Sequence, residues 1–222
     1  MAERPRCRVV ALISGRGSNL QAILDGVDDG SLPVEMLAVV SNEPGAGGLA
    51  RAERAGVAPR VVPHRGRPRR EFEAELGTLL AELSPDLVVL AGFMRVLGAE
   101  LVERFRGRML NIHPSLLPDY RGLDTHARAL ADGGAEHGVS VHFVTPELDG
   151  GPVIAQTRVP VLANDTPEGL AARVLVQEHR LYPLMVRWFA TGRLALREER
   201  IYLDGLPLAR PILFSGDEPC DC

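Results

Sequence analysis

An asparagine and a histidine lie two residues apart at the end of an apolar run, in Asn111-Ile112-His113-Pro114. Residues i and i+2 of a β-strand project to the same face, so the Asn111 amide and the His113 imidazole are expected side by side. Pro114 keeps His113 extended and ends the strand. An amide donor beside a titratable imidazole suits acyl transfer, in which a carbonyl oxygen becomes an oxyanion. A structural histidine next to a turn-capping asparagine is the alternative interpretation.

A carboxylate, Asp149, lies in the Gly- and Pro-rich segment 145–152, between two predicted strands. Placed next to His113, this carboxylate would raise the pKa of the imidazole and fix its tautomer. Taken alone, the segment is better described as a hairpin turn with a solvated acid. The spacing therefore makes Asp149 a candidate only if another observation connects it to His113.

A possible anion site is indicated by Ser14-Gly15-Arg16-Gly17-Ser18-Asn19, between a predicted strand and a predicted helix. Glycines allow a close approach of the backbone to a ligand, and the N–H groups of a first helical turn point at an anion. The dinucleotide fingerprint needs Gly or Ala at position 20, where Leu20 stands, and no P-loop Lys-Ser/Thr pair follows. Phosphate binding and an ordinary turn capped by Ser18 or Asn19 stay open as alternatives.

No metal site is predicted, because a structural zinc site needs four closed ligands. Cys220 and Cys222 have no partner pair nearby. No ligand spacing connects the other histidines, which are His126, His137, His142 and His179. The arginines of segment 65–70 lack interleaved aromatic residues and are interpreted as a solvated loop.

The composition is that of an ordinary globular protein, with 45% hydrophobic and 24% charged residues among 222. A net charge of −4 gives no global field for nucleic acid or an anionic membrane. Three cysteines at the chain ends exclude a secreted disulfide framework. With no signal peptide and no apolar run of membrane-spanning length, a cytoplasmic location is expected.

The elements that would position these residues alternate between strand and helix in the first half of the chain. Strands are predicted at 8–13, 34–40, 60–62 and 86–91, and helices at 19–28, 47–55 and 69–83. Continuous apolar strands indicate burial on both faces. The order therefore predicts an α/β fold, a doubly wound, mostly parallel sheet with helices on both faces. Asn111 and His113 would then lie at the carboxyl edge of the sheet, where open α/β sheets bind ligands.

The second half is richer in strands, which are predicted at 108–113, 139–144 and 153–161. Helices are expected near 123–131 and at 167–189, the latter with Thr166 as N-cap and Pro167 at its first position. Pro183 is expected to kink or break that helix. The prediction is a single domain, 1–222, with a nucleotide-binding-like half (about 8–110), a second half (about 111–203) and a loosely ordered tail (204–222).

Five motifs in their order along the chain resemble the folate-dependent phosphoribosylglycinamide formyltransferases of purine biosynthesis. They are Gly15 to Gln21, Leu90 to Arg95, Asn111 to Pro118, Gly138 to Val144 and Leu148 to Pro152. The similarity spans about 9–203, nearly the whole chain. It implies the Rossmann-like formyltransferase fold, and it makes the second half the folate and catalytic half.

The resemblance also implies roles for individual residues. Asn111, His113 and Asp149 match the catalytic residues of the family. Gly17, Ser18 and Asn19 match the family residues that hold the substrate phosphate. Glu178 matches the residue that contacts the glycinamide and ribose portion of the substrate. The residues that match folate-binding positions of the family are Arg69, Met94, Arg95, Val96, Leu97, Asn111, Thr145, Pro146, Glu147, Leu148 and Asp149. Arg16, Arg121, Asp124 and the cysteine-bearing tail depart from the family pattern.

The activity implied by the resemblance is formyl transfer from 10-formyltetrahydrofolate, as co-substrate, to the amine of glycinamide ribonucleotide. Asn111 and a His113 held protonated by Asp149 would stabilise the oxyanion. Asp149 or a water would carry the proton from the attacking amine to the leaving folate nitrogen. No metal, nucleic acid or membrane is implied, and the enzyme would be a monomer or a homodimer.

Two alternatives remain at this point. One is another enzyme on the same core, formylating methionyl-tRNA or hydrolysing formyltetrahydrofolate. The tRNA enzyme is expected to carry an added C-terminal domain and a basic face, and the hydrolase an N-terminal regulatory domain. The other alternative is a non-catalytic nucleotide-binding module, which would need no Asn111–His113–Asp149 constellation.

Overall fold

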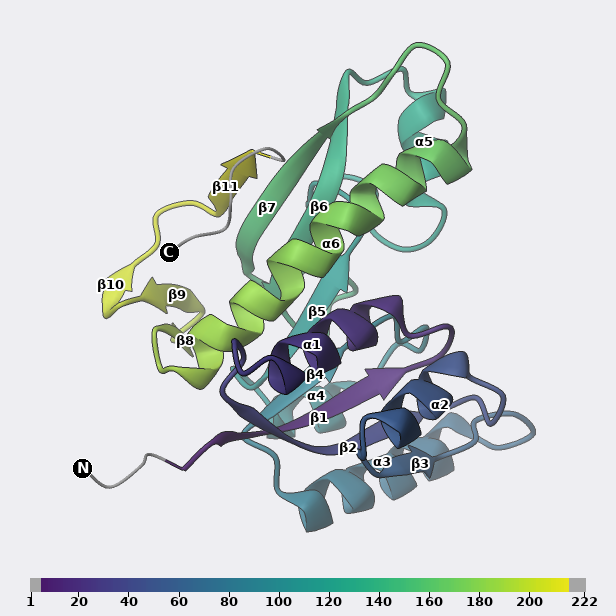
Figure 1. Ribbon diagram of the computed structural model, residues 1–222, viewed down its shortest axis with the longest axis vertical. Helices are drawn as coiled ribbons and strands as arrows, with labels where there is room; N and C mark the ends of the chain where they lie inside the picture. The colour runs from purple at the N-terminus through teal and green to yellow at the C-terminus, as the bar shows by residue number, and fades with distance from the viewer. Residues whose placement is uncertain (1–4, 216–222) are drawn as a thin grey trace.

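A computed structural model describes residues 5–215 of the chain (Figure 1). The strands are β1 (Cys7–Ile13), β2 (Val34–Ser41), β3 (Pro59–Val61), β4 (Leu87–Leu90), β5 (Met109–His113), β6 (Glu136–Phe143), β7 (Val153–Pro160), β8 (Leu194–Arg197), β9 (Arg200–Leu203), β10 (Leu206–Pro207) and β11 (Ile212–Ser215). The helices are α1 (Ser18–Asp28), α2 (Gly47–Arg54), α3 (Arg69–Leu83), α4 (Ala99–Arg104), α5 (Thr125–Ala131) and α6 (Pro167–Ala190).

Eight strands form the central sheet in the order β11-β7-β6-β5-β4-β1-β2-β3. Every pairing in this sheet is parallel except those of β6 with β5 and β7, so β6 alone runs in the opposite direction. The predicted mostly parallel sheet is therefore confirmed. The chain winds outward from β1 to β3 and then crosses to β4 on the other side of β1. This reversal places the loops after β1 and β5 together at the carboxyl edge of the sheet.

Helices cover both faces of this sheet and bury two separate apolar layers (Figure 1). On one face α1, α2 and α6 pack on alternate residues of the central strands, such as Val9 and Ala11 of β1. On the other face α3 and α4 pack on the intervening residues, such as Val10 and Leu12. The continuous apolar strands thus serve both layers at once, as their composition predicted.

Helix α6 runs without interruption through Pro183, so the prediction that this proline breaks the helix is wrong. The Thr166 hydroxyl accepts a hydrogen bond from the Gly169 N–H, which confirms the predicted N-cap. Leu181, Tyr182 and Leu184 around the proline are buried, and this packing outweighs the loss of one helical hydrogen bond. The Tyr182 hydroxyl also lies 3.0 Å from the carbonyl oxygens of Leu90 in β4 and Leu110 in β5.

The chain after residue 203 forms two short strands, so the prediction of a loosely ordered tail is wrong for residues 206–207 and 212–215. Strand β10 extends a small antiparallel sheet with β9 and β8, and β11 pairs in parallel with β7. The buried ring of Phe214 packs against Trp188 of α6, with ring centroids 6.3 Å apart. This contact gives the strand a place in the main core. Cys220 and Cys222 lie outside the described residues.

Candidate active site

Asn111 and His113 lie on β5, at the carboxyl edge of the sheet, as predicted. The Asn111 amide nitrogen donates to His142 Nε2 at 3.1 Å and to Asp149 Oδ1 at 3.4 Å. His113 Nε2 donates to the Tyr120 carbonyl oxygen at 2.9 Å, and its Nδ1 lies 3.5 Å from Asp149 Oδ2. The amide and the imidazole therefore meet through the carboxylate, which contacts both.

Asp149 is placed by a left-handed turn, with φ at +47°. Its Oδ2 accepts a hydrogen bond from the Gly122 N–H at 2.9 Å, so the loop 119–124 contributes to the same cluster. The side chain is only 9% exposed. The hairpin-turn interpretation of segment 145–152 fails here, because this carboxylate faces buried partners instead of solvent.

His142 is a member of the cluster that its sequence context did not reveal. Its Nδ1 donates to the Phe143 carbonyl oxygen at 2.9 Å, which leaves Nε2 as the acceptor for the Asn111 amide. Nε2 also lies 3.7 Å from Asp149 Oδ1. Only the strand register identifies His142 as a member, because His142 is the direct partner of Asn111 in the antiparallel β5–β6 pair.

Burial lowers the pKa of His113 below its ordinary value, and the charges of His142 and Arg128 act in the same direction. The Tyr120 carbonyl and Asp149 raise this pKa but do not compensate. The prediction that Asp149 holds His113 protonated is therefore wrong for the ligand-free site. The imidazole is neutral near pH 7. The Nε2 hydrogen is directed at Tyr120.

Asp149 remains ionised in spite of its burial. Burial by itself raises the pKa of this carboxyl, but the neighbouring His142 ring, the hydrogen bond from the Gly122 N–H and the charge of His113 together lower it. The cluster thus holds one carboxylate at neutral pH. A carboxylate in this position can accept a proton or favour a positive charge that develops on His113.

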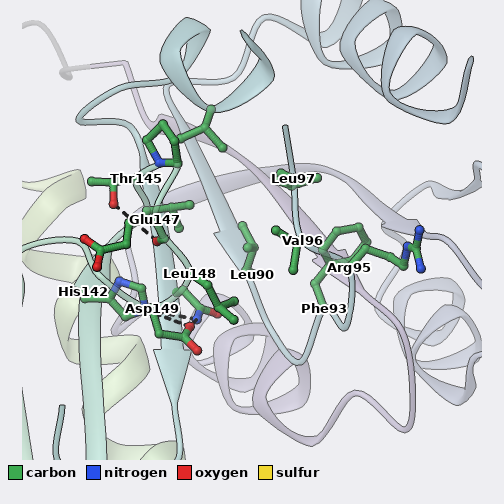
Figure 2. A pocket seen from close by; sticks show the side chains of 14 residues that line it. Leu90, Phe93, Arg95, Val96, Leu97, His142, Thr145, Glu147, Leu148 and Asp149 are labelled. Carbon is green, nitrogen blue, oxygen red and sulfur yellow. Dashed lines mark hydrogen bonds and ion pairs between the residues drawn. The ribbon is translucent and has the colours of Figure 1, made fainter. Parts of the chain in front are cut away.

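A pocket opens beside this cluster, between the segment after β4 and the loop after β6 (Figure 2). Asn111, His142 and Asp149 form a polar end of the pocket, whereas His113 is not among the lining residues. Figure 2 shows Asp149, His142 and Leu148 gathered on one side, with Arg95 directed away from them. The other lining residues are Leu90, Phe93, Val96, Leu97, Val102, Val144, Thr145, Pro146 and Glu147.

Two of the residues predicted on the folate side, Met94 and Arg69, do not line this pocket. Met94 is 67% exposed, and its N–H donates to the Ser14 hydroxyl oxygen at 2.8 Å. Arg69 begins α3 and pairs with Glu73, whose carboxylate also accepts the Gly98 N–H at 2.7 Å. Arg69 is thus connected to the rim of the pocket through Glu73.

The loop 15–19 joins β1 to α1 and leaves backbone donors free. Gly17 is the N-cap residue, with φ at +73°, and no side chain caps the helix. Within residues 5–215, no acceptor contacts the N–H groups of Gly17, Ser18 or Asn19. Because four N–H groups at a helix start lack intrahelical partners, these three are available to hydrogen-bond an acceptor from outside the helix. The interpretation of Ser18 or Asn19 as a helix cap is not supported.

Glu178 reaches the same loop from the middle of α6. The Asn19 amide nitrogen donates to Glu178 Oε2 at 2.6 Å, across 159 residues of sequence. Burial raises the pKa of the Glu178 carboxyl, partly offset by this hydrogen bond. The Asn19 Oδ1 atom is buried without a partner among the described residues. Two of the predicted substrate-binding residues are thus in contact, and one of them has an unused acceptor.

Arg121 and Asp124 lie in the loop whose Gly122 N–H contacts Asp149. The Arg121 guanidinium forms an ion pair with Glu147, which lines the pocket. Asp124 takes a left-handed conformation and precedes α5 as its N-cap residue. Neither side chain contacts Asn111 or His113. Among the described residues, no group of three or more His, Cys, Asp or Glu could hold a metal ion.

Comparison with known proteins shows relatives along most of the chain. A family model described as formyl transferase matches residues 7–186. A phosphoribosylglycinamide formyltransferase of Escherichia coli is 50% identical over 95% of this chain and 99% of its own length. A solved phosphoribosylglycinamide formyltransferase of Coxiella burnetii is 49% identical, with a TM-score of 0.90 over 95% of this chain and all of that one.

The chain belongs to the formyl transferase family. Within the family it groups with the phosphoribosylglycinamide formyltransferases, and this is the name that its close relatives carry. A solved formyltetrahydrofolate deformylase of Burkholderia mallei is more distant, at 30% identity and a TM-score of 0.82, and the chain covers 70% of it. None of the helices within residues 5–215 is long and apolar enough to cross a membrane.

Proposed function

We propose that the protein transfers the formyl group of 10-formyltetrahydrofolate to the amine of glycinamide ribonucleotide, a step of purine biosynthesis. The observation that carries this proposal is the Asn111–His113–Asp149 cluster, whose Asn111 and Asp149 side chains line a pocket with apolar walls. The loop 15–19 supplies the anion site that a phosphorylated acceptor needs.

The pocket residues fit a flat, polar-edged pterin. Apolar side chains such as Val96 and Leu97 form its walls, and backbone groups of these segments can read the polar edge. The Arg95 Nε atom is buried without a partner among the described residues, so one charged donor beside the pocket is unused. We assign Thr145, Pro146, Glu147 and Leu148 to the same folate pocket, and we place Arg69 and Met94 at its outer edge.

The chemistry follows from the cluster. As the acceptor amine bonds to the formyl carbon, negative charge develops on the formyl oxygen. The Asn111 N–H that reaches Asp149 at 3.4 Å can donate to this oxygen instead, and His113 Nε2 can do so once it gives up its hydrogen bond to the Tyr120 carbonyl. His113 donates in its neutral form, and the Asp149 carboxylate can accept the amine proton. When the bond from carbon to the folate nitrogen breaks, that nitrogen takes up the proton.

The test is a spectroscopic assay of folate deformylation with and without glycinamide ribonucleotide. We expect turnover only in its presence, with formyl transfer to the amine. The deformylase of similar fold makes hydrolysis the second candidate. Equal deformylation in the absence of the acceptor would support hydrolysis, and folate binding without turnover would support a non-catalytic module.

The setting of the enzyme is part of the same proposal. We place it in the cytoplasm, since its cysteine usage fits a reducing compartment. It would act as a monomer or homodimer of one domain on small-molecule substrates, with no metal and no nucleic acid. Gel filtration with light scattering distinguishes the two assembly states.

A further inference from the structure

Two carbonyl groups of the loop 15–19 are held by the neighbouring helix α2. The Gly48 N–H donates to the Gly15 carbonyl oxygen at 3.0 Å, and Arg51 Nε donates to the Arg16 carbonyl oxygen at 2.9 Å. In a trans peptide the C=O and N–H groups point in opposite directions. The N–H groups of Arg16 and Gly17 are therefore turned away from α2, toward the side on which an anion can approach.

We propose that Arg51 is a positioning residue, which holds the loop in the conformation that binds the substrate phosphate. This inference rests on the proposed function, because it takes the anion at the loop 15–19 to be that phosphate. It assigns to Arg51 no contact with the substrate. The guanidinium acts through the orientation of the Arg16–Gly17 peptide.

The geometry of the guanidinium suits this task. Arg51 Nε bonds the loop, and Nη1 donates to Gln21 Oε1 at 2.9 Å, in the first turn of α1. Gln21 in turn donates to Asp25 Oδ1 at 2.8 Å. A planar fork with two fixed donors connects the loop peptide to the helix that follows it. A rotation of that peptide would break the hydrogen bond between Arg51 Nε and the Arg16 carbonyl oxygen.

The contact between the two helices leaves little room for other loop conformations. A Cβ atom built on Gly17 would lie 2.7 Å from the Gly48 Cα and 3.5 Å from the Arg51 Cδ. Both glycines are buried, whereas Arg51 is half-buried and covers the loop. The backbones thus touch, and Arg51 supplies the directional hydrogen bond at this contact.

The decisive variant is Arg51→Gln, assayed by steady-state kinetics with each substrate varied in turn. We expect the KM for glycinamide ribonucleotide to rise about tenfold or more, because the variant loses a charge-assisted hydrogen bond to the loop. The kcat and the folate KM are expected within about twofold of the wild type, because the cluster on β5 does not contact Arg51. Competitive inhibition by inorganic phosphate against this substrate is expected to weaken by a similar factor.

Two further variants separate positioning from other effects. Arg54→Gln removes the same charge from the same helix, and no hydrogen bond joins Arg54 to the loop, so wild-type kinetics are expected. Arg51→Lys keeps the charge but lacks the planar fork, so the acceptor KM is expected to remain raised. If Arg51→Gln does not fold, as judged by circular dichroism, Arg51→Lys provides the test.

The outcomes are distinguished by a loop variant, Ser18→Asp, which places a carboxylate where the dianion would bind. If Ser18→Asp raises the acceptor KM while the Arg51 variants leave it unchanged, the positioning role is refuted and the phosphate assignment stands. A lysine variant with wild-type KM would also refute positioning, since charge alone would then suffice. If neither Ser18→Asp nor the Arg51 variants change it, the phosphate assignment itself is wrong.

Discussion

At the scale of single residues, the site depends on three side chains that were recognisable in the sequence and one that was not. Asn111 and His113 share a strand, and Asp149 joins them from a loop. The pair was detectable because the strand repeat fixes which face each residue occupies. His142 was not, because its contact with Asn111 depends on strand register across 31 residues.

Removal of either predicted oxyanion donor tests the catalytic assignment. We expect Asn111→Ala and His113→Ala each to lower kcat by about a hundredfold or more, because loss of one such donor raises the barrier by about 3–4 kcal/mol. Steady-state kinetics together with circular dichroism checks this. Near-normal turnover in a folded variant would remove that residue from the mechanism.

The pairing of Asp149 with His113 predicts a change in titration. Asp149 raises the pKa of His113 against the larger effect of burial, so Asp149→Asn is expected to lower that pKa further. The measurement is an NMR titration of the His113 ring resonances in both proteins. An unchanged pKa would contradict the pairing even if activity fell.

At the scale of elements, hydrophobic patterning predicted most helices and strands, and the failures have a physical cause. Helix α3 begins and ends where the pattern placed it, since apolar residues recur along its whole length. The short helix α4 was missed, because six residues cannot form a stable helix alone and depend on buried contacts of Leu101 and Val102. Pro183 and β11 were misjudged for the same reason, since tertiary packing decides both.

The turn between β1 and α1 allows a test of backbone conformation. Gly17→Ala is expected to lower the free energy of unfolding by about 1–2 kcal/mol or more, because a side chain at positive φ is strained and its Cβ would meet the Gly48 backbone at 2.7 Å. Urea denaturation measures the change. Gly15→Ala is the matched control, since a Cβ there has no neighbour within 4 Å, and equal losses in both variants would contradict the argument.

At the scale of the whole molecule, histidines buried in the neutral form make stability depend on pH. Burial lowers the pKa values of His113 and His126, and burial with the nearby charge of His126 lowers that of His137 to about 4. Between about pH 6.5 and 4 the unfolded chain therefore binds more protons at these sites than the folded chain. Their contribution to stability is complete above this window and is lost as the pH falls through it.

We expect His137→Gln to reduce the fall in the free energy of unfolding between pH 6.5 and 4. The raised pKa of Glu178 acts in the opposite direction, so the informative quantity is the difference between wild type and variant at each pH. Urea denaturation across this range provides it. Parallel profiles for the two proteins would show that His137 does not contribute.

The position of β11 has a consequence for how the chain is made. A ribosome delivers β7 well before β11, its partner in the sheet, because α6 and the small antiparallel sheet are synthesised between them. Until Phe214 emerges, the outer N–H and C=O groups of β7 face solvent or another nascent chain. Vectorial synthesis therefore leaves one open sheet edge until residues 212–215 are available, and this interval is when the nascent protein is most prone to aggregation.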